Sequence, residues 1–388
     1  MLTKNIVFTN FQINKKTSKI KVIFKKLKNF FFKKNDKLLT SFSDQYKYSF
    51  KSNELKKYKK FKTINIVGMG GSVLGAEAIY SFLKFKIKKK FFFLNNLKLE
   101  KKTGKKNQLN IFISKSGNTL ETINNFHNLA KKDKSLFITE NKNNYLRKIA
   151  NKMKSEIFDH RDFIGGRYSV LSETGMLPAM LMGLNCKKFK RLNYLINNKN
   201  FEKKLILNVS TIMHLYKNRK TNSIILNYDE SSQDLFYWYQ QLVAESLGKK
   251  GRGILPVISL VPKDNHSLMQ LYLDGTKNNF FTFFMVEDIK TQKINTKDLL
   301  DSHYFLKNKK TLDILKAQFY ATQSVFNKRK IPFRSFIIKK RNEETLGELF
   351  TFFMLETIML GRALNINPFD QPEVELIKKE TKKILTNF

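Results

Sequence analysis

The hydrophobic and polar positions of the chain follow two alternating patterns, which together predict an α/β fold. Short apolar runs such as TINIVG (63–68) and LNIFI (109–113) end in glycine or polar turns, as buried strands do. Longer stretches follow them, in which apolar residues recur every three or four positions, as in amphipathic helices. Strands that alternate with helices predict parallel sheets with helices on both faces.

The alternation occurs in two successive parts of the chain, which we interpret as two domains. The first part, residues 59–186, has expected strands at 63–68, 89–97, 109–113, 135–141 and 155–160. The second part, residues 187–388, has expected strands at 222–230, 254–262, 278–287 and 333–341, and closes with a basic amphipathic helix. Residues 1–58 form a Lys- and Phe-rich N-terminal extension, whose phenylalanines we expect to dock on the core as a short helix. The expected architecture is therefore two domains, each a parallel β-sheet flanked by helices.

Length and composition are those of a globular protein. The chain has 388 residues, 41% of them hydrophobic, and lacks an apolar run long enough for a membrane-spanning helix. The first residues have neither the apolar core nor the cleavage site of a signal peptide. Cys186 is the single cysteine, so no intramolecular disulfide can form, which fits a reducing cytoplasm.

The net charge of +41 raises the question of a nucleic-acid partner. Lysine greatly outnumbers arginine, however, and the lysines are spread along the whole chain together with many Asn, Ile and Phe residues. We interpret this composition as the bias of an AT-rich genome, and no zinc-knuckle, helix-turn-helix or RNP-type pattern accompanies it. Nucleic-acid binding is therefore the less favoured interpretation, although a positive field would help to attract a small anionic substrate.

Two titratable residues flank one expected strand. Glu245 lies in the helical run DLFYWYQQLVAES, and His266 lies in the loop that opens the next helix. A Gly-rich loop, 248–253, and the strand at 254–262 separate them. We expect this strand to bring both residues to one rim of a sheet, where a carboxylate and an imidazole can act as two proton carriers. Taken singly, each residue also fits an ordinary surface role.

A polar turn between an expected strand and an expected helix, SKSGNTLET, predicts a phosphate site. It brings together Ser114, Lys115, Ser116, Asn118 and Thr119. Hydroxyl groups, backbone N–H groups and a helix N-terminus all favour binding of a phosphate. A polar N-cap is the alternative, but a cap needs only one such residue. The spacing GxxxxGK[ST] is missing, which argues against a nucleotide P-loop.

The turn GMGGS, which ends with Gly71 and Ser72, follows the first expected strand and opens a helix. Glycines allow the backbone to approach a ligand closely, and the helix N-terminus attracts anions. A dinucleotide fingerprint is the rival interpretation of this spacing. The next strand, FFFLNNL, lacks the acidic residue that would bind a ribose, so the dinucleotide site is disfavoured.

Further candidates lie in two other motifs. GGRYS places Gly166 and Arg167 just before an apolar helix, where an arginine can stabilise a developing oxyanion. Lys378 follows Gln371 by about two helical turns in the last helical run, so both can face one side. An ordinary surface ion pair or a solvated lysine is the alternative for each cation. The five histidines show no HxH or HExxH spacing, so no metal site is expected.

In combination, five motifs resemble the glucose-6-phosphate isomerase family of the phosphosugar-isomerase (SIS) superfamily. They are GMGGSVLGAE, SKSGNTLET, GGRYSVLSETG, the pair QQLVAESLGKKGRG and KDNHSLMQLYLDGT, and DQPEVELIKK. They occur in the family's order between about residues 64 and 380. The resemblance implies two SIS-type domains and the reversible conversion of glucose 6-phosphate into fructose 6-phosphate through a cis-enediol, in glycolysis and gluconeogenesis.

The resemblance also implies a role for each candidate residue and requires no cofactor. Glu245 would move the proton between C1 and C2, Arg167 would stabilise the enediolate, and His266 with Lys378 would assist ring opening. The sugar phosphate and sugar would be held by Gly71, Ser72, Ser114, Lys115, Ser116, Thr119, Gly166 and Gln371. The family's members are dimers in which the histidine reaches into the partner's site, so we expect a cytoplasmic homodimer.

Two alternatives share the implied fold. A sugar-phosphate sensor without catalytic activity would keep the SKSGNT turn but would need neither Glu245 nor His266. An isomerase that also accepts mannose 6-phosphate is the second, and Gln371 leans weakly towards glucose over it. Both residues of the proton-carrier pair are present together with Arg167, which favours the enzyme.

Overall fold

The computed structural model describes residues 1–11, 17–34, 36–97, 107–129, 133–295, 297 and 299–388. The strands are β1 (Ile6–Thr9), β2 (Thr63–Gly68), β3 (Lys90–Leu94), β4 (Leu109–Ile113), β5 (Lys134–Thr139), β6 (Glu156–Asp159), β7 (Asn222–Asn227), β8 (Leu255–Leu260), β9 (Asn279–Val286) and β10 (Phe333–Ile338). They form two five-stranded sheets, in the order β3-β2-β4-β5-β6 and β1-β10-β9-β7-β8.

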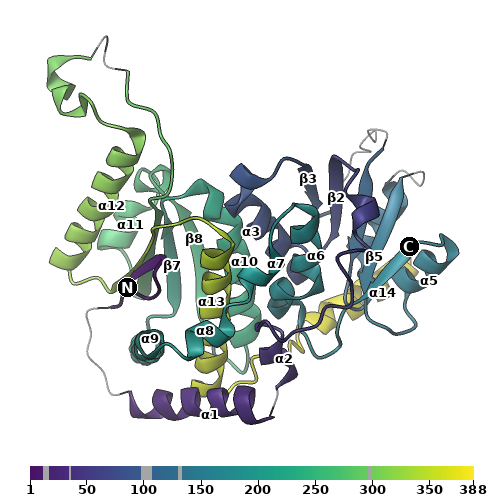
Figure 1. Cartoon of the computed structure of the whole chain (residues 1–388). Helices are drawn as coiled ribbons and strands as arrows, with labels where there is room; N and C mark the ends of the chain where they lie inside the picture. Colours follow the sequence, from purple (N-terminus) through teal and green to yellow (C-terminus); the bar gives the residue numbers. More distant parts are fainter. Residues whose placement is uncertain (12–16, 35, 98–106, 130–132, 296, 298) are drawn as a thin grey trace.

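The two sheets stand apart, with helices between them and on their outer faces (Figure 1). The longer helices are α1 (Ser18–Lys34), α3 (Leu74–Phe82), α4 (Leu120–Asn128), α5 (Tyr145–Lys152), α6 (Glu173–Leu181), α9 (Lys199–Lys217), α10 (Gln233–Leu247), α12 (Thr311–Lys328), α13 (Glu343–Ala363) and α14 (Val374–Thr386). The shorter ones are α2 (Lys37–Thr40), α7 (Cys186–Phe189), α8 (Leu192–Ile196) and α11 (Met269–Asp274). None of these described helices combines the length and apolar character needed to cross a membrane.

The first sheet is parallel throughout and buries both faces, as its apolar strands predict. Along β4, Leu109 and Ile111 face the core that the two domains share, while Phe112 faces a separate cluster. That cluster also contains Phe126 of α4 and Leu146 of α5, so these two helices cover the outer face. Alternate side chains of the strand therefore point to opposite faces of the sheet, and helices cover each face.

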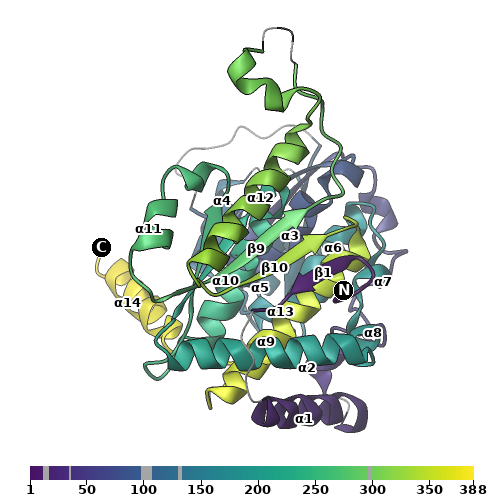
Figure 2. The same cartoon turned by 90° about the vertical axis from the view of Figure 1, so that its left-hand side faces the viewer.

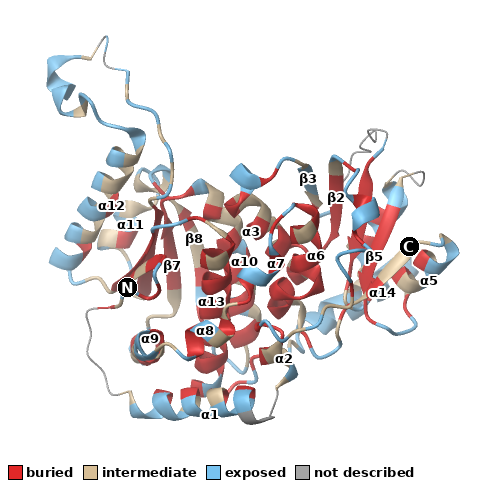
Figure 3. Ribbon diagram, in the orientation of Figure 1, coloured by how far each residue is buried: buried red, intermediate tan, exposed pale blue. Residues whose placement is uncertain are grey.

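The second sheet is parallel except at its edge. Strands β10, β9, β7 and β8 run in one direction, and β1 pairs antiparallel with β10. Phe283 of β9 packs on Phe319 and Phe326 of α12, which covers the outer face of the sheet with α11. The opposite face turns towards α9, α10 and α13, and Figure 3 shows α13 as buried over almost its whole length.

Residues 1–58 contribute to the core of the second sheet. Phe8 of β1 lies between Phe336 of β10 and Phe352 of α13, with ring centroids 4.7 Å and 5.6 Å apart. In α1 the buried residues are Ile20, Phe24, Leu27 and Phe31, whose spacing forms one helical stripe. The expected phenylalanine-bearing helix is thus present, at 17 residues, and the strand ahead of it was not foreseen because its apolar run is very short.

A buried cation fixes the rest of the N-terminal extension. The ammonium group of Lys190 donates hydrogen bonds to the carbonyls of Ser41 and Leu171 and lies 4.6 Å and 5.0 Å from the ring centroids of Tyr46 and Tyr48. Burial lowers the pKa of Lys190 to about 7, against a smaller raising effect of nearby carboxylate charge. Burial therefore disfavours the charged form of the Lys190 side chain, although two carbonyls and two aromatic rings contact its ammonium group.

Lys190→Met should change the pH dependence of stability in a defined direction. The unfolded chain, with a lysine pKa near 10.5, binds a proton that the folded protein releases above about pH 7. The free energy of unfolding of the native protein should therefore rise relative to that of the variant between pH 7 and 10, by at most roughly 1.4 kcal/mol per pH unit. Urea unfolding at pH 7 and 9 measures this, with the exposed Lys188→Met as control. A pH-independent difference between native protein and Lys190→Met would contradict the assignment.

Candidate active site

The carboxyl ends of β2 and β4 form the first part of the site. These strands are neighbours, and Gly68 pairs with Ile113 in their register. The short helix η2 (Gly70–Ser72) follows β2, and the SKSGNT turn follows β4 and leads into α4. The two motifs that the sequence separates by some forty residues therefore lie side by side at one rim, where parallel sheets commonly bind ligands.

The turn after β4 has the form of an anion receptor. The hydroxyl of Ser114 lies 2.8 Å from that of Thr119 and accepts a hydrogen bond from the backbone N–H of Gly117 at 3.2 Å. Thr119 is the N-cap residue of α4, but its side chain does not cap the helix. The first-turn N–H groups of α4 thus remain available to an anion. Gly117 has φ +68°, and a Cβ there would meet the Asn144 amide at 2.0 Å, so the turn requires glycine.

Lys115 and Ser116 lie at the outer side of this turn. The ammonium of Lys115 donates to the Asp162 carbonyl at 2.7 Å and lies 3.5 Å from the Glu140 carboxylate. Ser116 is exposed, and its hydroxyl accepts from the N–H of Asn118 at 3.3 Å. The expected phosphate role of Lys115 is thus combined with an ion pair that the sequence did not indicate.

Gly71 and Gly166 bring the first rim into contact with the arginine motif. A Cβ on Gly71 would lie 2.2 Å from the backbone of Gly166 and 2.5 Å from the N–H of Arg167. Only glycine at 71 therefore allows the two backbones to approach this closely. The contact places Ser72 next to η4 (Gly166–Leu171), the short helix that carries Arg167.

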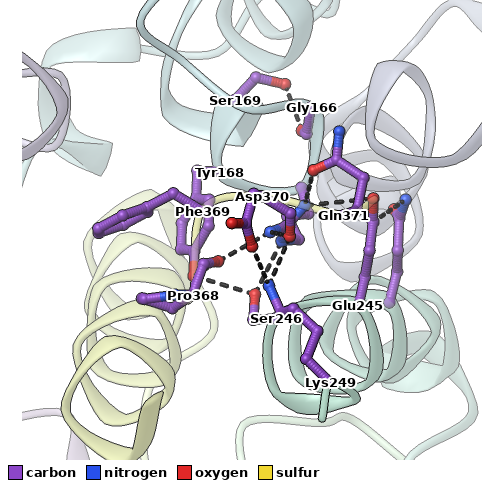
Figure 4. A network of polar contacts seen from close by, with 12 residues as sticks. Gly166, Tyr168, Ser169, Glu245, Ser246, Lys249, Pro368, Phe369, Asp370 and Gln371 are labelled. Carbon is purple, nitrogen blue, oxygen red and sulfur yellow. Dashed lines mark hydrogen bonds and ion pairs between the residues drawn. The ribbon is translucent and has the colours of Figure 1, made fainter. Parts of the chain in front are cut away.

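Arg167 is the centre of the site, although only 2% of its surface is exposed. Its guanidinium lies 3.2 Å from the Glu245 carboxylate and donates to the Gln371 side chain at 2.8 Å. It also donates to the Ser246 hydroxyl at 2.7 Å and to the carbonyls of Pro368 and Asp370 at 2.8 Å and 3.0 Å. Figure 4 shows these partners converging from α10 and from the segment after α13. Arginine alone has the fork of donors that this arrangement requires.

Glu245 lies in the last turn of α10, as predicted, beside the Gly-rich loop. Its carboxylate accepts a hydrogen bond from the Gln241 amide at 2.9 Å, and its side chain keeps 22% of its surface exposed. One oxygen thus faces Arg167 and the other faces Gln241. The sequence analysis missed Gln241, although its four-residue spacing from Glu245 on one helix was a usable signal.

Gln371 joins the site, but Lys378 does not. The expectation that both face one side of a helix is wrong, because α14 begins only at Val374. Gln371 precedes the helix and binds Arg167. Lys378 lies on exposed α14, which Figure 2 shows at the side of the molecule, and its ammonium pairs with Glu375 at 2.6 Å.

His266 lies away from Glu245 within one chain. Glu245 precedes β8 and His266 follows it, so the two residues are at opposite ends of this strand. Its six residues (Leu255–Leu260) span roughly 17 Å. The expectation of one common rim is therefore wrong. The helix α10 runs antiparallel to β8 and places Glu245 near the amino end of that strand, whereas His266 follows its carboxyl end. His266 is exposed, next to a loop that Asp264 anchors to Ser259 at 3.0 Å.

The arrangement joins an anion receptor to a carboxylate that is held by a guanidinium and an amide. Such a carboxylate can accept and return a proton, while the guanidinium can stabilise negative charge on an adjacent oxygen. Tyr168 supports the guanidinium: its hydroxyl lies 3.0 Å from that of Ser246, and burial raises its pKa to about 12, so it stays neutral. Within the described residues, no group of His, Cys, Asp or Glu side chains is arranged to hold a metal ion.

The chain has extensive similarity to known proteins. The family model described as phosphoglucose isomerase matches residues 34–388. A glucose-6-phosphate isomerase of Methanocaldococcus jannaschii is 32% identical over 348 residues, which cover 84% of this chain and 85% of that protein. One of Mycoplasmopsis synoviae is 33% identical over 353 residues, with 82% and 81% covered.

Solved structures share the fold. A hypothetical protein from Thermus thermophilus superposes with a TM-score of 0.82 at 24% identity, over 94% of both chains. A glucose-6-phosphate isomerase from Chlamydia trachomatis gives 0.70 at 19% identity, over 86% of this chain and 72% of that one. With a family model that covers most of its length and relatives above 30% identity, this chain belongs to the phosphoglucose isomerase family.

Proposed function

We propose that this protein is a glucose-6-phosphate isomerase, which interconverts glucose 6-phosphate and fructose 6-phosphate through a cis-enediol. The observation that carries the proposal is the pairing of Glu245 with Arg167 at 3.2 Å. The backbone contact of Gly71 with Gly166 connects this pair to the sheet edge that carries the SKSGNT turn. A sugar-phosphate sensor without catalytic activity needs the turn, but it does not need a carboxylate such as Glu245, which Arg167 and Gln241 hold in place. Family membership supports the same activity.

Each part of the site has one task in this reaction. The turn from Ser114 to Thr119 and the Gly71–Ser72 backbone bind the phosphate and so fix the position of the sugar carbons. Glu245 takes the proton from C2 of the open-chain aldose and returns it to C1, and the reverse reaction uses the same group. Arg167 stabilises the negative charge that develops on the enediolate oxygen. One carbon of the substrate is oxidised as its neighbour is reduced, so the reaction is redox-neutral overall and needs no redox cofactor.

A coupled assay of the purified protein with fructose 6-phosphate tests the activity directly. Formation of glucose 6-phosphate is followed through a dehydrogenase that consumes it. The same assay with mannose 6-phosphate as substrate, coupled to detection of fructose 6-phosphate, tests the wider specificity. We expect glucose 6-phosphate formation; protein that binds fructose 6-phosphate without turnover would favour the sensor instead.

We further propose that the working form is a cytoplasmic homodimer in which the partner's copy of His266 assists ring opening together with Lys378. The two ends of β8 separate Glu245 from His266 within one chain, whereas a second copy can supply an exposed histidine to the first. Lys378 would have to approach by movement of α14. The single buried thiol of Cys186 agrees with a reducing compartment.

A heterodimer of two inactive variants tests this arrangement. Glu245→Gln and His266→Ala chains with different tags are co-expressed, and dimers that carry both tags are isolated. If His266 acts across the interface, one site of the heterodimer has both native residues and the other has neither. Its kcat should therefore be about half of native, far above that of either homodimer.

The same heterodimer gives a different result if both residues act within one chain. Each site then carries one defect, and activity stays near that of the single variants. Activity at that low level, or failure to isolate any dimer with both tags, would remove the cross-subunit role of His266.

A further inference from the structure

A second pocket lies at the amino ends of β7, β9 and β10, away from the catalytic site. Its volume is about 440 Å³, within the usual range for small-molecule sites. Its lining comes from the three turns that enter these strands, with Lys220, Lys277 and Arg329 among their residues, and from α11 and β9, which contribute Tyr272 and Phe281. Figure 2 shows that α11 and α12 cover the face of the second sheet on which this pocket lies. Arg167 and Glu245 lie on the opposite, α10 side of the sheet.

Four cationic side chains surround this pocket, and three of them donate hydrogen bonds to two backbone carbonyls. The ammonium of Lys277 and the guanidinium of Arg329 donate to the same Leu273 carbonyl, at 3.2 Å and 3.4 Å. The ammonium of Lys220 donates to the Lys277 carbonyl at 2.5 Å. Lys330 completes the set from the turn after α12. Each cation keeps further N–H groups beyond the bond it makes, so the carbonyls position them without saturating them.

Negative charge at the pocket is sparse. Among the described residues, the ion-pair partner of these cations is Asp274, an exposed carboxylate 3.9 Å from Arg329. Burial, and then the charge of Lys277, lower the pKa of Lys220, which agrees with a crowd of like charges. The cations come from three separate segments of the chain, around Lys220, Lys277 and Arg329, which the fold brings to one pocket.

The floor of the pocket is apolar. The half-buried side chains of Leu273, Ile331 and Pro332 form its accessible surface. Beneath them the buried rings of Tyr272 and Phe281 meet edge to face, with centroids 5.3 Å apart. Cations above an apolar floor suit a ligand with a charged end and a flat or apolar body.

From this combination we propose that the pocket binds a small phosphate ester, with its phosphate on Lys277, Arg329 and Lys220 and its body on the apolar floor formed by Leu273, Ile331 and Pro332. The site is separate from the catalytic phosphate receptor and does not depend on the proposed isomerase activity. Binding at this pocket should leave the receptor at Ser114–Thr119 empty.

Calorimetry and methyl NMR with adenosine 5′-monophosphate as probe test the proposal. The δ1-methyl signal of Ile331 reports on the pocket, and that of Ile113, next to Ser114, reports on the catalytic receptor. We expect the probe to shift Ile331, to bind more tightly than inorganic phosphate or adenosine, and to weaken with added salt. The double variant Lys277→Gln/Arg329→Gln should bind it about tenfold or more weakly.

The control variant Lys309→Gln/Lys328→Gln removes the same charge from exposed positions outside the pocket and should bind the probe as the native protein does. An equal loss of affinity for the probe in both double variants would show that the overall charge of the protein, and not the pocket, determines binding. That result would overturn the proposal. A probe that shifts Ile113 alone, or inorganic phosphate that binds as tightly as the ester, would also overturn it. A DNA oligonucleotide that displaces the probe at lower concentration would assign the surface to nucleic acid instead.

Discussion

Glu245→Gln is expected to lower kcat by about 10²–10⁴, which is the usual effect of losing an acid–base catalyst. Glutamine keeps the length of the side chain and can still bond to the Arg167 guanidinium, but it cannot accept a proton. The proposed binding contacts of the sugar phosphate lie elsewhere, in the Ser114–Thr119 turn, so KM should change little. The measurement is steady-state kinetics in both directions of the isomerisation.

Solvent isotope exchange sharpens this test. In deuterated water the native enzyme should introduce solvent deuterium into the product, at least in part, because its base exchanges with water. The Glu245→Gln enzyme should largely fail to do so. Glu230→Gln, an exposed carboxylate just ahead of α10, is the matched control and should behave as the native enzyme. Near-native kcat in Glu245→Gln would assign the base to another residue.

Arg167→Lys is expected to reduce kcat by about 10²–10³, the effect of losing one preorganised donor to an oxyanion. It should also lower the thermal unfolding midpoint. A lysine ammonium keeps the charge beside Glu245, but it cannot reproduce the planar fork that reaches Gln371, Ser246 and the Pro368 carbonyl together. The segment after α13 would thereby lose its main attachment.

Tyr168→Phe separates the catalytic effect of Arg167 from its structural one. The tyrosine hydroxyl also joins Ser246 to the Pro368 carbonyl, at 3.0 Å and 3.1 Å, without facing Glu245. Its loss should lower the unfolding midpoint and leave kcat within about a factor of three, since one neutral hydrogen bond contributes modestly. If both variants lost activity in proportion to stability, Arg167 would be a structural residue only.

Much of the fold follows from local pattern. The apolar runs predict the buried strands because a strand covered on both faces must be apolar at almost every position. The SKSGNT turn is equally local: Ser114, Gly117 and Thr119 interact with one another, so their sequence spacing determines their geometry. The position of Glu245 at a helix end followed from the Gly-rich loop that stops α10.

The relations between distant motifs did not follow from pattern. The expectation that Gln371 and Lys378 share one helical face failed because α14 begins only at Val374. Gln371 precedes Pro372, and a residue before proline is disfavoured in a helix. The expectation that Glu245 and His266 meet failed because one residue precedes β8 and the other follows it. An extended strand holds the residues at its two ends far apart. Gln241 was missed although its spacing from Glu245 places both on one helix face, because only the contact of Glu245 with Arg167 shows that this face belongs to the site.

The sequence by itself thus determined the α/β class with largely parallel sheets, the individual turns and the residue types that the chemistry needs, because each depends on contacts between near neighbours. Only the tertiary structure decided that Arg167, Glu245 and Gln371 meet, and that His266 does not join them in one chain. These contacts join residues up to 204 positions apart. Such contacts depend on the packing of whole helices and sheets, which no local spacing specifies.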